Sequence, residues 1–143
     1  MSVQERNRQL RIVSEIVLVH LPECLARDQA LARDLLAVAG TALRTIYDDA
    51  EESSKSWDKR AYHVRADELR REWDWALGAA NYALGLALQS EPLTQSTIAK
   101  LRVMIRPDIE APSRRQIQDP ERFRGAAKAV RNLEAHKRKP IRG

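Results

Sequence analysis

The chain has 143 residues, of which 43% are hydrophobic and 31% charged, and this balance indicates a folded globular protein rather than a disordered one. Five glycines and six prolines are too few for a turn-rich β fold, so the composition favours helices. The longest apolar run, residues 16–19, is far shorter than the ~20 residues that a membrane span needs, and the first residues lack the pattern of a signal peptide. We therefore expect a cytoplasmic protein with one hydrophobic core.

Positive charge is concentrated near the C-terminus. Residues 1–112 contain 15 Lys or Arg against 17 Asp or Glu, a net charge of −2. Residues 113–143 contain 10 basic residues against 3 acidic ones, a net charge of +7. The chain is therefore divided into a helical bundle at 1–112 and a basic C-terminal extension at 113–143, and this asymmetry is the main indication of function.

The spacing of apolar residues predicts the first two helices. The first runs from residue 2 or 3 to His20, because Pro22 disfavours helix just beyond it. The second covers about residues 23–48, with one apolar face. Residues 48–56 are almost entirely polar and are expected to connect it to the next helix.

Residues 57–89 are expected to form the longest helix. Its many small residues, two glycines among them, would let a second helix approach closely, and this packing would offset the low helix propensity of glycine. Trp73 and Trp75 are two residues apart, so on a helix they point about 200° away from each other. We expect Trp73 in the core, and Trp75 with Tyr82 at a protein interface in an oligomer or with a partner.

Two shorter helices follow. Thr94 is expected to cap a fourth helix that ends before Pro107. Asp119 is expected to cap a fifth, from Pro120 to about Lys137. The predicted fold is all-α: an antiparallel four-helix bundle with long second and third helices, followed by a C-terminal basic helix.

The C-terminal segment carries the strongest candidate site. On a helix that starts at Pro120, the side chains of Arg124, Lys128 and Arg131 fall at i, i+4 and i+7 and line one side. Such a stripe suits a phosphate backbone, because each cation that neutralises a phosphate releases a counterion. The residues expected to bind nucleic acid are Arg114, Arg115, Arg122, Arg124, Lys128, Arg131, Lys137, Arg138 and Lys139. The alternatives are a solvated tail and a membrane-surface helix, and the segment's single Phe disfavours the membrane.

Catalytic patterns are sparse. Arg131 and His136 have the arginine-four-residues-histidine spacing of helical ribonuclease domains, in which the histidine acts as general base. His63 and Asp67 lie four apart, which is more typical of a surface hydrogen bond. A lone Cys24, the lack of a Glu-x-x-His pair and the lack of a glycine-rich phosphate loop favour a protein that is not an enzyme and uses no metal or cofactor.

The segment 65–71, Arg-Ala-Asp-Glu-Leu-Arg-Arg, continues in apolar sequence and then passes through a short turn at 93–95 into residues 98–105. Over about residues 20–106 this layout resembles the accessory variability determinants of diversity-generating retroelements and the related rRNA intervening-sequence proteins. The resemblance implies a ring-shaped oligomer of helical bundles that binds a reverse transcriptase and structured RNA. The Gly-Arg-x-Leu-Gly ending of many members is absent here, and the acidic balance of residues 1–112 does not match the family's basic bundle.

These observations predict a non-catalytic RNA-binding accessory subunit of a ribonucleoprotein. It is expected to form a homo-oligomer and to bind a larger protein partner, such as a reverse transcriptase. No association with a membrane is expected. One alternative is a small helical ribonuclease that uses Arg131 and His136. Another is a protein-only scaffold or small subunit of a defence or phage assembly, whose basic tail docks on an acidic protein.

Overall fold

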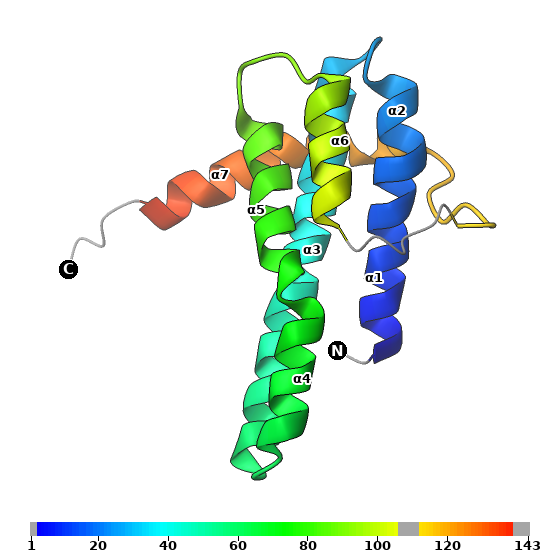
Figure 1. Ribbon diagram of the computed structural model, residues 1–143. Coiled ribbons are helices and arrows are strands. Elements are labelled where there is room, and N and C mark those ends of the chain that lie inside the picture. The colour runs from blue at the N-terminus through cyan, green and yellow to red at the C-terminus, as the bar shows by residue number, and fades with distance from the viewer. Residues whose placement is uncertain (1–2, 106–111, 139–143) are drawn as a thin grey trace.

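The computed structural model describes residues 3–105 and 112–138, and every regular element within them is helical, which confirms the all-α class. In chain order the elements are α1 (Val3–Glu15), η1 (Ile16–His20), α2 (Leu21–Cys24), α3 (Gln29–Lys59), α4 (His63–Trp73), α5 (Trp75–Leu88), α6 (Gln95–Met104), η2 (Pro120–Phe123) and α7 (Ala126–Arg138). Helices α1, α3, α5 and α6 lie side by side in the body, and α7 lies across one side of it (Figure 1). None of the helices in the described ranges is both long and apolar enough to cross a membrane.

The sequence predicted that the first helix ends at His20, ahead of Pro22, and this prediction is wrong. The helical segment continues from Val3 to Cys24 through η1, a stretch of π-helix in which the Leu21 N–H bonds the Ile16 carbonyl oxygen. Proline has no N–H and its ring crowds the preceding turn, and the wider π turn directly before Pro22 accommodates both effects. Val3–Cys24 is therefore one continuous helical segment.

Helix α3 is longer than predicted and occupies the expected connection. It begins after Asp28, whose carboxyl group accepts the Leu31 N–H at 3.0 Å, and its 31 residues reach about 46 Å. Residues 48–56 are helical because Ala50 and Ser54 are buried, Ala50 in a small second core with Trp73 of α4. The polar residues of this stretch lie on the remaining sides of a two-helix hairpin that extends beyond the other helices (Figure 1).

The turn that ends α3 lies at residues 60–62. The Tyr62 N–H bonds the Trp57 carbonyl and the Ala61 N–H bonds the Asp58 carbonyl, both at 2.9 Å, which is the Schellman pattern. Ala61 takes the left-handed position with φ +64°, where glycine is usual. Because alanine takes the place of the usual glycine, no helix stop could be recognised at this position from the sequence.

The predicted helix over 57–89 is in fact two helices, α4 and α5, interrupted at Asp74. Trp73 is buried as expected, but Trp75 is half-buried and its ring centroid lies 6.0 Å from that of Trp73. The Trp75 Nε1–H donates to the Glu72 carbonyl at 2.9 Å. The two rings therefore lie close together and not on opposite sides as expected, because the Trp75 ring lies back toward the Glu72 carbonyl.

Close packing between α3 and α5 is confirmed, although the glycines responsible differ from those expected. The small residues that α5 buries are Ala76, Ala79, Ala80, Ala83 and Ala87. A Cβ atom on Gly40 of α3 would lie 2.7 Å from the Leu84 Cγ and 3.1 Å from the Leu84 backbone nitrogen, so only glycine fits there. Gly78 and Gly85 are exposed, and a Cβ on Gly85 would meet nothing within 4 Å.

The predicted cap of α6 is confirmed. The Thr94 hydroxyl accepts the Thr97 N–H, and the Thr97 hydroxyl accepts the Thr94 N–H in return, which forms a capping box. Helix α6 ends at Met104, and the expected stop before Pro107 lies outside the described residues.

Asp119 caps η2 as predicted, by accepting the Glu121 N–H at 3.0 Å, but residues 120–137 do not form one helix. The short 3-10 helix η2 ends at Phe123, and α7 begins after Gly125, whose φ of +92° favours glycine. Arg124 therefore lies in a turn and does not continue the basic stripe of α7.

Candidate nucleic-acid interface

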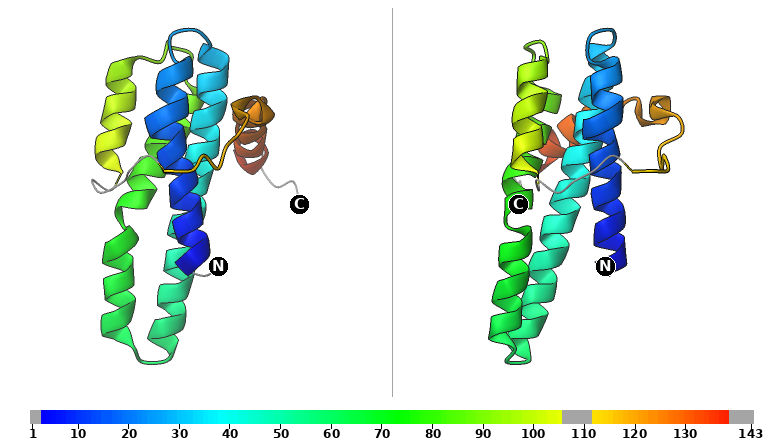
Figure 2. Two further views of the ribbon diagram at one scale, coloured as in Figure 1. Left: turned by 90° about the vertical axis from the view of Figure 1, so that its right-hand side faces the viewer. Right: turned by 45° about the vertical axis from the view of Figure 1, so that its right-hand side comes forward.

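The C-terminal segment is attached to the body by a buried carboxyl group. The side chain of Glu15 is fully buried; its Oε1 accepts the Gln116 N–H at 2.5 Å and its Oε2 accepts the Ile117 N–H at 2.8 Å. His20 Nε2 lies 2.8 Å from the same Oε2. The Ile117 side chain is 0% exposed and belongs to the main core, so the extension shares the core of the body. The segment crosses α1 at this point (Figure 2).

A second buried carboxyl group positions the start of α7. Asp34, 7% exposed on α3, accepts the Gly125 N–H at 3.1 Å and the Ala127 N–H at 3.0 Å. The first N–H groups of a helix lack partners within the helix and favour a nearby negative charge. Asp34 therefore acts as a cap for α7 from a different helix.

Arg124 forms the third attachment. Its guanidinium bonds both Asp28 carboxyl oxygens, at 3.2 and 2.5 Å, and its Nε bonds Glu121 at 2.6 Å. The hydrogen bond from Arg124 is the largest cause that lowers the pKa of Asp28 to about 2, and it also lowers the pKa of Glu121. Bonds to Glu121 and Asp28 raise the pKa of Arg124. This predicted phosphate ligand is therefore engaged within the protein.

The other predicted contacts divide into two groups. Those that contact another group of the protein are Arg115, 3.4 Å from a Glu23 carboxyl oxygen; Arg131, which donates to the Leu88 carbonyl at 3.3 Å; and Arg122, which lies over the Phe123 ring. Of these contacts, the one to Glu23 is with a carboxyl group. Those that are exposed and form no ion pair within the described ranges are Arg114, Lys128 and Lys137. Arg138 is the last residue of α7, and Lys139 lies outside the described residues.

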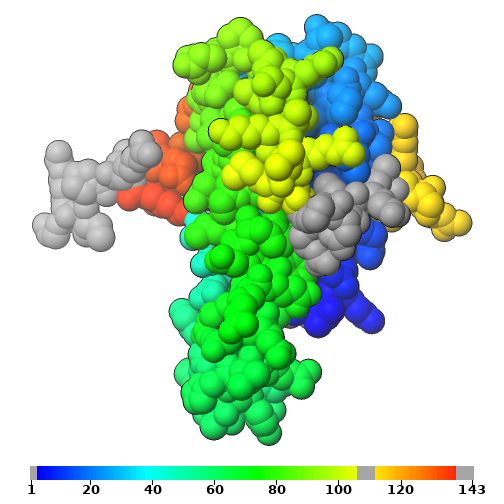
Figure 3. Space-filling view, viewed as in Figure 1, coloured from blue at the N-terminus to red at the C-terminus, as the bar shows by residue number. Residues whose placement is uncertain are grey.

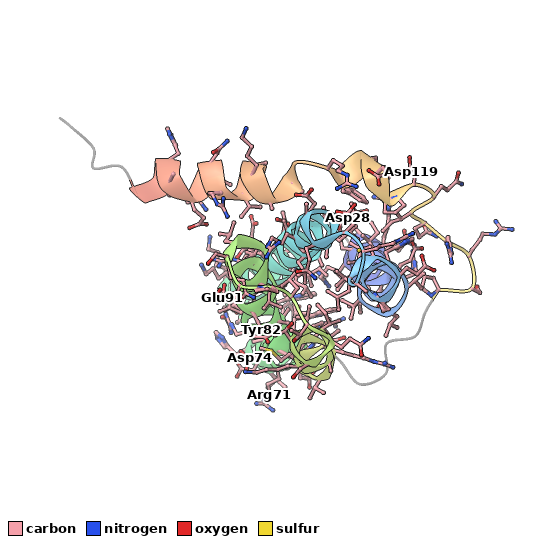
Figure 4. The ribbon with its side chains drawn as sticks, turned by 90° about the horizontal axis from the view of Figure 1, so that it is seen from above. Asp28, Arg71, Asp74, Tyr82, Glu91 and Asp119 are labelled. Atoms are coloured by element: carbon pink, nitrogen blue, oxygen red, sulfur yellow. The ribbon has the colours of Figure 1, made fainter. Side chains whose placement is uncertain are left out.

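Helix α7 has an inner and an outer side. Ala126, Ala127 and Val130 pack against the main core, while Lys128 and Arg131 are exposed. Figure 4 shows nitrogen-tipped side chains pointing away from the body along the outer side of α7, and the helix continues past α5. A carbonyl partner leaves the charge of Arg131 in place, so the outer side keeps its positive charge.

Arg131 and His136 do not converge on one another. Both are exposed on α7, where five residues separate them by about 140° around the helix. Arg131 is held at the Leu88 carbonyl, and His136 forms no hydrogen bond within the described part of the chain. The two side chains are therefore not arranged as a general base with a phosphate-binding partner.

Trp75 and Tyr82, the predicted protein interface, are both half-buried at the edge of the main core. The Tyr82 hydroxyl lies 3.5 Å from the Thr97 carbonyl oxygen, and the Lys100 Nζ lies 5.1 Å from the Tyr82 ring centroid. Part of each aromatic surface is therefore used within the chain, that of Tyr82 between α5 and α6 and that of Trp75 against Trp73.

Sequence reasoning missed the two buried carboxyl groups, although each left a signal. Glu15 lies inside the most apolar stretch of the first helix, and Asp34 lies three residues after Leu31 and four before Val38, on the apolar side of α3. A charged side chain at a core-facing position requires a buried partner. That partner is a backbone segment far along the chain, which spacing alone does not identify.

The chain matches no family model, no curated protein and no solved structure. The functional argument therefore depends on the residues themselves. Across residues 3–105 and 112–138, no group of three or more His, Cys, Asp or Glu side chains is placed to hold a metal ion.

Proposed function

We propose that this protein binds RNA through the outer side of α7 and acts as a non-catalytic accessory subunit of a ribonucleoprotein. The observation that carries the proposal is the contrast between Arg124, which is neutralised by two carboxyl groups, and the exposed Lys128, Arg131 and Lys137, which have no carboxyl partner. Cations without such partners are the ones available to phosphates.

The attachment of α7 supports the same proposal. Asp34 and Glu15 hold the segment before and at the start of the helix, so its outer side is already placed before any ligand arrives. A preorganised surface loses less conformational entropy on binding than a flexible tail does. The outer side of α7 is thus better suited to RNA than its net charge alone indicates.

The resemblance of residues 65–71 and 93–105 to the accessory variability determinants supplies the rest of the proposal. This part of the proposal consists of an antiparallel four-helix bundle, assembly into a homo-oligomer, a cytoplasmic location and a reverse transcriptase as the protein partner. Trp75 and Tyr82 retain part of their surface for such contacts between proteins.

The test replaces Lys128, Arg131 and Lys137 by Gln in the full chain and measures binding of a labelled structured RNA by fluorescence anisotropy at several salt concentrations. We expect weaker binding and a decrease of about 2 in the slope of log K against log salt, since each lost phosphate contact removes about 0.7–0.9. The matched control replaces three exposed arginines of the body, Arg11→Gln, Arg71→Gln and Arg102→Gln. Equal losses in both variants, or no loss in the first, would contradict the proposal.

Deletion of residues 113–143 is a less informative experiment. It removes Gln116 and Ile117 along with the basic residues, and so leaves the buried Glu15 without its backbone donors. A loss of RNA binding would then follow from damage to the core as well as from lost charge.

A further inference from the structure

A second basic region lies at the far end of the α3–α4 hairpin. We call residues 55–65 the hairpin tip. It carries Lys55, Lys59, Arg60 and Arg65, and its one carboxylate is Asp58. The tip projects beyond the rest of the body (Figure 3), away from the side that α7 covers.

The turn explains one contact in the tip. The Trp57 and Tyr62 rings meet edge-on, with centroids 5.6 Å apart and planes at 82°. Apolar contact between these two positions commonly accompanies a Schellman turn, and the backbone bonds of Trp57 and Tyr62 form such a turn. This contact needs no functional explanation.

The two arginines are not required by the turn. The Arg60 guanidinium carbon lies 4.7 Å from the Trp57 ring centroid and 5.4 Å from that of Tyr62, and the Arg65 guanidinium carbon lies 4.7 Å from that of Trp57. Contact with a ring face holds a guanidinium in place while its N–H groups stay available for hydrogen bonds.

The carboxyl group of the tip does not neutralise these arginines. Asp58 bonds Arg70 at 2.6 Å and His63 at 2.9 Å, and the bond from Arg70 is the largest cause that lowers the pKa of Asp58. The four Lys and Arg side chains of the tip form no ion pair within the described residues; they are Lys55, Lys59, Arg60 and Arg65. The tip therefore keeps a cluster of uncompensated positive charge.

Exposed aromatic surface accompanies the charge. Tyr62 is 52% exposed, and Trp57 and Arg65 line a cleft of about 500 Å³ between α4 and the start of α1. Glu68 and Glu72 lie on the wall of this cleft, where a carboxylate repels phosphate but accepts hydrogen bonds from base amino groups. The cluster and the cleft together offer contacts for both parts of a nucleotide.

We propose that the hairpin tip binds single-stranded nucleic acid, with Tyr62 stacking on a base while Arg60 and Arg65 bond to phosphates. The inference takes its ligand class from the proposed function, and it adds a second site and a preference for single strands. Bases must be unstacked from a duplex to reach an aromatic face, so a duplex loses the stacking contact.

The experiment measures anisotropy of a labelled single strand of about 12 nucleotides, and of the duplex of the same sequence, with the full chain. Tyr62→Ala should lower affinity for the single strand about tenfold and leave the duplex unaffected. Arg60→Gln with Arg65→Gln should lower the salt slope by about 1.4, since single strands lose about 0.7 for each contact. The control that removes equal charge is Arg11→Gln with Arg71→Gln.

A second variant guards against damage to the turn. Tyr62→Leu keeps an apolar side chain at the position that contacts Trp57, but removes the aromatic face. Its helical content by circular dichroism should equal that of the wild type, and its affinity for the single strand should fall as in Tyr62→Ala. Unchanged affinity in Tyr62→Leu overturns the stacking site.

The remaining outcomes separate this inference from the proposed function. Loss of binding in the α7 variant with unchanged binding in both tip variants overturns the tip site and leaves the proposed function in place. The reverse result supports the tip and contradicts α7. Binding to phosphatidylserine vesicles that depends on Arg60 and Arg65, without any effect of the tip variants on the single strand, would assign the tip to a lipid surface and overturn the inference.

Discussion

The arginines of two basic regions of this molecule have different kinds of neighbour. In residues 112–125, Arg115 and Arg124 face carboxyl groups of the body. In the hairpin tip, Arg60 and Arg65 face aromatic rings. Local net charge is positive in both regions, but carboxyl groups compensate Arg115 and Arg124 in the first, whereas no carboxyl group pairs with Arg60 or Arg65 in the second. The neighbour of each arginine therefore decides whether it is available to a ligand.

The difference follows from where each region lies. Residues 112–125 run along a body whose sequence is slightly acidic, and Glu23 and Asp28 are within reach. The hairpin tip extends away from the body, where its own Asp58 is already bonded to Arg70. In the first region, the arginines that attach the segment to the body are therefore paired with carboxyl groups. In the second region, the tip lies away from the body, and its arginines have no such pair.

The largest effect should come from breaking the attachment at Glu15. Glu15→Ala leaves the buried Ile117 N–H group and His20, and the part-buried Gln116 N–H group, without their partner, and we expect a loss of about 3–5 kcal/mol in the free energy of unfolding. Urea denaturation followed by circular dichroism measures it. Glu23→Ala is the control, because its exposed ion pair with Arg115 contributes less than about 1 kcal/mol. Similar losses in the two variants would show that Glu15 is not a principal attachment.

The next effect concerns the placement of α7. Asp34→Ala removes the acceptor of the Gly125 and Ala127 N–H groups and should destabilise the protein by about 1–3 kcal/mol. Hydrogen exchange should quicken at these two amides. RNA affinity should fall although a negative charge is lost, since the position of α7 is loosened; an increase would mean that charge alone governs binding. Asp34→Asn, which keeps one acceptor oxygen, should be milder.

A smaller effect tests the scaffold of the hairpin tip without changing its charge. Ala61→Gly relieves the left-handed conformation at φ +64° and should stabilise the protein by about 1 kcal/mol, while binding of single strands stays the same. Ala99→Gly, at an exposed position inside α6, should destabilise by about 1 kcal/mol. Thermal unfolding of both variants checks the opposite signs, and equal signs would contradict the strain at Ala61.

The smallest effect sharpens the account of Arg124. The pKa of Asp28 is lowered to about 2 in the folded protein, so its contribution to stability is fully present above the ordinary value of 3.8 and is lost as pH falls through about 2. NMR titration of the carboxyl carbon should give a midpoint near 2. In Arg124→Gln the midpoint should move up toward the ordinary value, and a midpoint that stays near 2 would remove Arg124 as the cause.

Local chemistry in the sequence predicted the helical class and the caps. Thr94 caps the helix expected of it, and Asp119 caps the element that begins at Pro120, although that element is shorter than predicted, because a cap depends on residues within one turn. The end of α3 was not predictable in the same way. Its polar residues contain no helix breaker, and the stop depends on an alanine in a conformation that usually requires glycine.

The candidate sites were only partly predictable for a different reason. Charge counting located the basic extension, but it could not distinguish Arg124, which meets Asp28 from 96 residues away, from Lys128 on the outer side of α7. Charge counting also could not identify the hairpin tip. Arg60 and Arg65 are positioned by contact with the Trp57 ring, and that contact exists only once the turn has formed.

The carboxyl group of Glu15 also sets an order of events during synthesis. Its backbone donors lie 101 and 102 residues later in the chain, and a ribosome adding about 5–20 residues per second delivers them roughly 5–20 seconds after Glu15. Through that interval the acid is hydrated and the adjoining core surface is open. The helices can form as they emerge, but the part of the core that Ile117 covers is completed only when Ile117 has been synthesised.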